Sequence, residues 1–171
     1  ARAMAKEYIV SKYGSKYYEN RYFKTKASAQ DAHEAIRPSN ILNGLDAFEY
    51  SFGHGYQMSS ELAFQAGQLF EKNNIKVSLH APFYINFANP NEEMFEKTKG
   101  YIITGIKFLR AFRADKLVFH PASCGKITRE EALKLTKFRF SQFFENFEEE
   151  GFLEGLFLCP ETMGKTMQIG T

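Results

Sequence analysis

From residue 45 onward, short apolar segments alternate with longer segments whose apolar residues recur at helical spacing. The helical segments begin near Ser59, near Asn91 and at Thr128, where Glu131 stands at capping-box spacing. We expect strands at 45–52, 75–80, 117–119 and 156–159. Four strands separated by three helices predict an α/β fold of right-handed βαβ units around a parallel sheet.

A shorter pattern precedes this region. One apolar helical face is expected over residues 2–13, made by Met4, Ala5, Tyr8 and Ile9. Gly14 can supply the left-handed residue that ends such a helix. After a turn-rich aromatic stretch, Pro38 disfavours further helix. The change of pattern near residues 40–44 predicts a short helical N-terminal segment, 1–40, joined to the α/β region, 41–171.

Composition narrows the class of protein. Hydrophobic residues make up 44% of the chain and charged residues 25%, as in folded soluble proteins. No apolar run approaches the roughly 18 residues of a membrane span. Two cysteines, Cys124 and Cys159, are too few for a disulfide framework and fit a reducing cytoplasm. We therefore expect a cytoplasmic protein without a membrane partner.

Charge is unevenly distributed. Residues 1–40 hold eight Lys or Arg and four Asp or Glu, a formal charge of +4, whereas the remainder carries −2. The basic front end is also rich in tyrosine. Both features are compatible with nucleic-acid binding, and a solvated basic face explains them equally well.

Three candidate metal ligands recur at the predicted strand ends. His120 follows His80 by 40 residues, and Glu161 follows His120 by 41. Because neighbouring parallel strands lie about 4.8 Å apart, their end residues can converge on one point. Two imidazoles and a carboxylate suit zinc. The alternative is that the histidines form hydrogen bonds at strand ends and that the carboxylate is solvated. His54, between Gly53 and Gly55, is expected to be a turn residue.

Several segments resemble successive strand-end motifs of the endonuclease IV family. They are Gly44-Leu45-Asp46-Ala47-Phe48-Glu49, Ser78-Leu79-His80-Ala81-Pro82-Phe83-Tyr84-Ile85-Asn86, Val118-Phe119-His120-Pro121 and Glu161-Thr162-Met163-Gly164-Lys165. The resemblance covers about 130 residues. It implies an eight-stranded barrel that cleaves DNA 5′ to an abasic site with a three-zinc cluster.

The resemblance also assigns roles to residues. His80 and His120 would hold one zinc, and Glu161 would be both a bridging ligand and a catalytic carboxylate. Phe83 stands where the family has an aromatic residue that enters the DNA, with Tyr84 and Asn86 nearby. Packing under a loop is the other reading of Phe83.

The chain also departs from that family. The family's first strand is absent, and the sequence stops after the fifth, so only one zinc site has all its protein ligands. A closed barrel takes about 250 residues. We therefore expect an open partial (β/α)8 barrel of about four parallel βα units, inactive or incomplete as this chain. Its open edges should favour self-association.

The N-terminal segment resembles a different family. Residues 29–39, Ala-Gln-Asp-Ala-His-Glu-Ala-Ile-Arg-Pro-Ser, are similar to a segment of type IA DNA topoisomerases. The resemblance gives His33 a place near the scissile phosphate and Arg37 a DNA contact. The family's nucleophilic tyrosine lies upstream of the matched region, so His33 is expected to be vestigial.

The sequence is thus interpreted as two joined fragments, both pointing to DNA. A natural fusion, a gene remnant and an assembly error remain open as origins of the junction. The alternatives to an abasic-site endonuclease are a metal-dependent sugar isomerase or epimerase with the same barrel, and a DNA-binding fragment derived from a topoisomerase.

Overall fold

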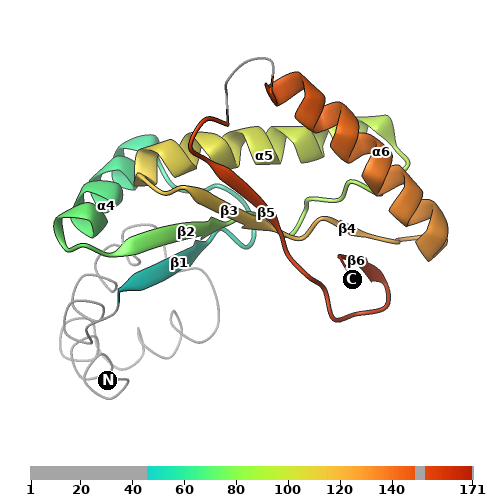
Figure 1. The fold of residues 1–171 in the computed structure, drawn as a ribbon, viewed down its shortest axis with the longest axis horizontal. Helices are drawn as coiled ribbons and strands as arrows, with labels where there is room; N and C mark the ends of the chain where they lie inside the picture. The colour runs from blue at the N-terminus through green and yellow to red at the C-terminus, as the bar shows by residue number, and fades with distance from the viewer. Residues whose placement is uncertain (1–45, 149–152, 171) are drawn as a thin grey trace. The chain divides into compact units, whose positions relative to one another are not determined.

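A computed structural model describes residues 46–148 and 153–170 of the chain. The expected helix over residues 2–13, together with His33 and Arg37, lies outside the described residues. The elements, shown in Figure 1, are β1 (Ala47–Ser51), α4 (Ser60–Lys72), β2 (Lys76–His80), α5 (Glu92–Phe112), β3 (Lys116–Phe119), β4 (Ala122–Ser123), α6 (Arg129–Glu148), β5 (Phe157–Pro160) and β6 (Gln168–Ile169).

Four of these strands form one sheet in the order β1-β2-β3-β5. β2 pairs with β3, and β3 with β5, both in parallel. The β1–β2 contacts run in the same direction, since Lys76 N donates to Asp46 O at one end and Phe52 N to His80 O at the other. The predicted α/β fold with consecutive parallel strands is therefore confirmed, and it corresponds to part of a TIM-type barrel.

Local signals in the sequence set the helix starts. Ser59 accepts a hydrogen bond from Leu62 N at 3.2 Å at the start of α4. At the start of α6, Thr128 N donates to Glu131 Oε2 at 2.9 Å, and Glu131 N donates to Thr128 Oγ1 at 3.3 Å. These reciprocal bonds form the predicted capping box, because each satisfies a helix-end donor that has no partner within the helix.

The chain divides into two compact units, and α4 belongs to the first. There Phe70 stacks on Phe48, with ring centroids 5.7 Å apart. A Cβ added at Gly67 would lie 2.6 Å from the carbonyl oxygen of Ala111 and 2.7 Å from the backbone of Phe112. The glycine therefore permits a close backbone approach that a larger residue would prevent.

The second unit comprises residues 49–56, 78–110 and 115–171. Within it, α5 and α6 lie on one side of β3 and β5 (Figure 1). Leu79, Leu117 and Phe119 are fully buried in the core, whereas the alternate positions Ser78 and Val118 are only half buried. The face of the sheet that points away from this core is therefore less buried, and Phe157 is exposed on it.

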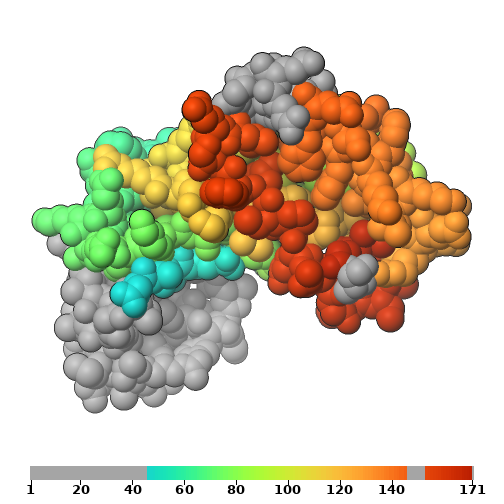
Figure 2. All heavy atoms as spheres, in the orientation of Figure 1, coloured from blue at the N-terminus to red at the C-terminus, as the bar shows by residue number. Residues whose placement is uncertain are grey.

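A second, two-stranded sheet, which the sequence pattern did not predict, ends the described chain. β4 and β6 pair antiparallel, with Ala122 opposite Ile169. Arg129 donates to the carbonyls of Thr166 and Gln168 at 2.9 and 2.7 Å. Figure 2 shows the C-terminal segment, in red, beside the orange start of α6. These contacts fold the chain back after Glu161.

No helix among residues 46–148 and 153–170 combines the length and the apolar character needed to cross a membrane.

Candidate metal centre

Two histidines and one glutamate converge at the carboxyl ends of the parallel strands. His80 ends β2, His120 follows β3, and Glu161 follows β5. Glu161 Oε2 lies 3.2 Å from His80 Nε2 and 3.0 Å from His120 Nε2. One ligand atom from each residue falls within 4.8 Å of the others. The structure therefore brings together all three residues that the strand-end spacing singled out.

Backbone pairing fixes where these side chains start. In the sheet register, His80 is opposite Val118, which in turn is opposite Cys159. The ladder continues past the strand ends, since Ala81 N donates to Val118 O at 2.8 Å and Glu161 N to Phe119 O at 2.9 Å. The three side chains therefore start from hydrogen-bonded backbone, which positions them more precisely than a free loop would.

A backbone hydrogen bond orients the His80 ring towards Glu161. Its Nδ1 lies 2.9 Å from the carbonyl oxygen of Ala81. Because a carbonyl can only accept, Nδ1 carries the proton of that hydrogen bond, and in the neutral ring Nε2 is then an acceptor. Nε2 lies 3.2 Å from Glu161 Oε2, so its lone pair is available to a metal ion at the point where the three side chains meet.

The donor set fits zinc. With metal–ligand bonds of about 2.1 Å, neighbouring ligand atoms of a tetrahedral zinc lie about 3.4 Å apart. The two contacts to Glu161 Oε2, 3.0 and 3.2 Å, are close to that separation. The Nδ1 bond to a backbone carbonyl is the usual outer contact of a zinc-bound histidine. His80 is 12% exposed and Glu161 42%, which leaves the cluster open towards solvent on the carboxylate side.

Phe83 lies over the cluster and is 52% exposed. Its ring centroid is 5.5 Å from that of His120 and 6.2 Å from that of His80. Its backbone N–H donates to Gly53 O at 3.1 Å. His54 lies in the turn expected for it, with Gly53 and Gly55 at φ +38° and +123°, and its ring is 6.1 Å from that of Phe83.

The other two predicted DNA contacts on this loop differ in their surroundings. Tyr84 is half exposed, and its ring lies 5.9 Å from that of Tyr101. Asn86 is partly buried, and its amide oxygen accepts hydrogen bonds from Ser123 N and Ala88 N, each at 3.0 Å. Sequence reasoning missed Ser123 as its partner, because no local spacing connects residues 37 positions apart.

A sequence model of the xylose isomerase-like TIM barrel family matches residues 42–171. An uncharacterized protein of Methanocaldococcus jannaschii is 33% identical over 143 residues, which are 84% of this chain and 50% of the relative. DNA topoisomerase 1 of Rickettsia typhi is 32% identical over 116 residues, a partial match to 66% of this chain and only 14% of the relative.

Two solved structures illustrate the shared fold. D-allulose 3-epimerase from Methylomonas sp. has a TM-score of 0.63 at 14% identity, covering 85% of this chain and 50% of that one. Endonuclease IV from Thermus thermophilus has a TM-score of 0.56 at 17% identity, covering 84% and 52%. At these identities the likeness concerns the fold alone. This chain spans about half the length of the M. jannaschii relative and of both structures.

Proposed function

The chain belongs to the xylose isomerase-like TIM barrel family, and from that premise we propose that it carries part of a zinc-dependent DNA repair hydrolase of the endonuclease IV type. The substrate would be DNA containing an abasic site, and the reaction would be hydrolysis of a phosphodiester. The observation that carries the proposal is the approach of His80 Nε2 and His120 Nε2 to a single oxygen of Glu161.

In this proposal His80, His120 and Glu161 are the zinc ligands. Zinc held there would act as a Lewis acid that lowers the pKa of water and neutralises phosphate charge. The carbonyl of Ala81 keeps the proton of His80 on Nδ1 and so keeps Nε2 free to bind. Glu161 would supply a carboxylate ligand beside the two imidazoles, as the resemblance to endonuclease IV implies.

Exposed aromatic residues beside the cluster support DNA as the substrate. Phe83 and Tyr84 are each about half exposed, although burial of a large aromatic side chain is normally favourable. Filling the gap left by a missing base gives such a ring a stacking partner, worth about 1–3 kcal/mol per base. Asn86, on the same loop, is partly buried and would support the same surface.

A sugar isomerase or epimerase is the second candidate. Its support is the fold similarity to D-allulose 3-epimerase from Methylomonas sp.. A metal ion held by strand-end ligands of this type can also bind the hydroxyl and carbonyl oxygens of a sugar. A third, non-enzymatic candidate is a DNA-binding fragment that uses the basic segment 1–40. It rests on the topoisomerase-like motif that contains His33 and Arg37 and on the partial similarity to DNA topoisomerase 1 of Rickettsia typhi, which covers 66% of this chain and so extends beyond segment 1–40.

Binding to abasic DNA tests the first candidate. Fluorescence anisotropy would compare the zinc-loaded chain on a duplex with one abasic site and on the intact duplex. We expect tighter binding to the abasic duplex, with the preference reduced in Phe83→Ala. The matched control is Phe138→Ala, which removes an exposed phenylalanine on α6. Equal binding to both duplexes would count against abasic-site recognition, and salt-sensitive binding without preference would favour the third candidate.

Zinc- or manganese-dependent turnover of ketohexoses, absent in His80→Ala, would favour the second candidate instead.

Two further properties are proposed with the function. Cys124 and Cys159 are free thiols, which suits a reducing cytoplasm.

β1 and β5 are the outer strands of the described sheet. Unpaired strand edges can pair with another chain, so self-association through these edges is expected at high protein concentration.

A further inference from the structure

The loop that connects β2 to α5, residues 81–91, is anchored at its centre by Asn86. The amide Oδ1 of Asn86 accepts hydrogen bonds from Ser123 N and from Ala88 N, both at 3.0 Å. Its Nδ2 lies 3.2 Å from Ser123 Oγ, and its backbone N–H donates to Thr98 Oγ1, also at 3.2 Å. One side chain thus contacts its own loop and β4, while its backbone contacts α5.

These contacts connect the two segments that carry the histidines. His80 lies at the start of the Asn86 loop, and Ser123 lies in β4, three residues after His120. A backbone bond strengthens the connection, since Phe87 N donates to Pro121 O at 3.1 Å. Because His80 ends β2 and His120 follows β3, the separation of their imidazoles depends on the β2–β3 pairing and on such links between the segments that follow the two strands. Their ring centroids are 5.2 Å apart.

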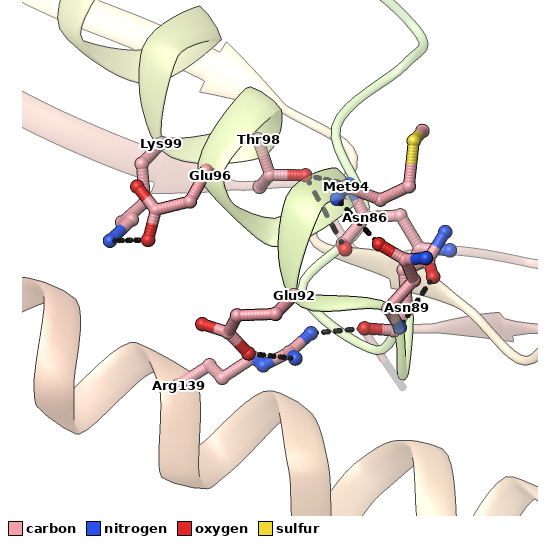
Figure 3. A network of polar contacts seen from close by, with 9 residues as sticks. Asn86, Asn89, Glu92, Met94, Glu96, Thr98, Lys99 and Arg139 are labelled. Carbon is pink, nitrogen blue, oxygen red and sulfur yellow. Dashed lines mark hydrogen bonds and ion pairs between the residues drawn. The ribbon is translucent and has the colours of Figure 1, made fainter.

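A second anchor holds the far end of the same loop. Arg139, on α6, is 4% exposed and donates to the carbonyl of Asn89 and, at 3.0 Å, to Glu92 Oε2. Its guanidinium carbon lies 4.3 Å from the centroid of the Phe95 ring. Figure 3 shows Arg139 against Asn89 and Glu92, and Asn86 against Thr98 of α5. Arg139 forms hydrogen bonds to the loop and to α5. Asn86 instead forms hydrogen bonds to Ser123, which lies three residues after His120.

We infer that Asn86 is a positioning residue of the metal centre: together with the pairing of β2 and β3, its bridge to Ser123 sets the separation of His80 and His120. The inference rests on the proposed metal centre. Residues that orient metal ligands typically change metal affinity by about 10–100-fold when they are replaced. A direct DNA contact is the role that the resemblance to endonuclease IV implies for Asn86. The bonds that its amide already makes inside the protein favour the positioning role.

Cobalt(II), whose visible absorption reports ligand geometry, is the metal probe. Metal-free wild type, Asn86→Ala and Asn89→Ala would be titrated with cobalt chloride. We expect Asn86→Ala to bind cobalt at least tenfold more weakly, with an altered absorption spectrum. Asn89→Ala is the matched control: it lies in the same loop and loses one bond, from Asn91 N at 3.1 Å, but no bridge to β4. It should match wild type in affinity and spectrum.

The Asn86→Asp variant distinguishes an effect on the position of the metal ligands from an effect on the stability of the fold. The aspartate keeps an oxygen that accepts from Ser123 N and Ala88 N, so the wild-type spectrum should return even if the melting temperature does not. If Asn86→Ala fails to fold, Ser123→Ala takes its place. That variant removes only the Oγ contact, so a smaller loss of affinity with a shifted spectrum is expected.

A metal-free measurement distinguishes failure of this inference from failure of the proposed centre. In protein without metal, nuclear Overhauser contacts between the His80 and His120 rings should be present in wild type and in Asn89→Ala, and weakened in Asn86→Ala. A wild type that binds no cobalt would refute the metal centre, and the ring contacts alone would then decide the role of Asn86. Unchanged cobalt spectrum, affinity and ring contacts in folded Asn86→Ala would overturn the inference.

Discussion

The backbone of Gly170 lies close to the carbonyl oxygen of Glu161. A Cβ built at Gly170 would lie 2.6 Å from the carbonyl oxygen of Glu161, and the φ angle of Gly170 is +139°. Both the space and the backbone conformation therefore require glycine. Because Glu161 is the carboxylate of the candidate metal centre, this close approach connects the end of the described chain to the position of a ligand.

Replacement of Gly170 by alanine should therefore affect both stability and metal binding. We expect Gly170→Ala to lower the free energy of unfolding by about 1–3 kcal/mol, as overpacked positions do, and to weaken zinc binding. The measurements are urea denaturation with a chelator present and zinc titration of the folded protein. Gly164→Ala is the control, because no atom lies within 4 Å of a Cβ there. Equal effects of the two substitutions would contradict the prediction.

Zinc content should depend on the two clustered histidines. The His80→Ala, His120→Ala double variant is expected to lose most of the zinc that the wild-type chain retains after dialysis, since it removes two of three ligands. His54→Ala, which removes a histidine outside the cluster, should retain zinc. Elemental analysis of the purified proteins measures this. Equal zinc in the double variant and in wild type would show that the ligands were wrongly assigned.

The 171-residue chain by itself should incise abasic DNA weakly or not at all. The described residues supply one group of three ligands, whereas phosphodiester hydrolysis of this type gains much from several metals sharing the phosphate. Relaxation of supercoiled plasmid should also be absent, because the topoisomerase-like motif comes without a matching nucleophilic tyrosine. Gel assays with zinc or magnesium test both activities. Robust incision that disappears in Glu161→Gln would disprove the expected inactivity and support the site.

The Arg139 anchor should contribute more to stability than its ion-pair partner. Arg139 is buried and uses its guanidinium for the Asn89 carbonyl and the Phe95 ring, whereas the Glu92 side chain is 73% exposed. We expect Arg139→Ala to cost about 2 kcal/mol of unfolding free energy and Glu92→Gln less than about 1 kcal/mol. Chemical denaturation monitored by circular dichroism compares them. A larger effect of Glu92→Gln would reverse the assignment.

Tyr56 should make the fold sensitive to high pH. Burial, and then repulsion from Tyr101, raise its pKa well above the ordinary 10.0, and its hydroxyl donates to Tyr101 O at 2.9 Å. A raised folded-state pKa contributes stability that is complete below about pH 10 and is lost as pH rises towards the folded value. Tyr56→Phe cannot ionise, so its unfolding free energy should fall less steeply above about pH 10. Identical pH slopes would exclude this role.

Much of the fold was predictable because its signals are local. Ser59 and the pair Thr128 and Glu131 mark helix starts by hydrogen bonds within three residues, and these bonds form as expected. The cluster of His80, His120 and Glu161 was predictable for another reason, since consecutive parallel strands bring equivalent ends together. Boundaries moved by only one or two residues, as at β1 and β5.

The features that escaped prediction depend on distant partners. β4 and β6 have two residues each, too few for any periodicity, and distant contacts such as the hydrogen bonds of Arg129 to the carbonyls of Thr166 and Gln168 hold β6 in place. The bond between Asn86 and Ser123 likewise has no local pattern. Neither Asn nor Ser reveals from sequence whether it faces solvent or a partner.

The cluster joins residues that are far apart in the chain, with 81 positions between His80 and Glu161. Closing so long a loop is entropically costly, and it comes late when contacts form from local to distant. A chain in which β5 is not docked would offer a metal ion the two imidazoles without the carboxylate and would therefore bind it more weakly. By mass action, metal binding would stabilise the state in which β5 is docked.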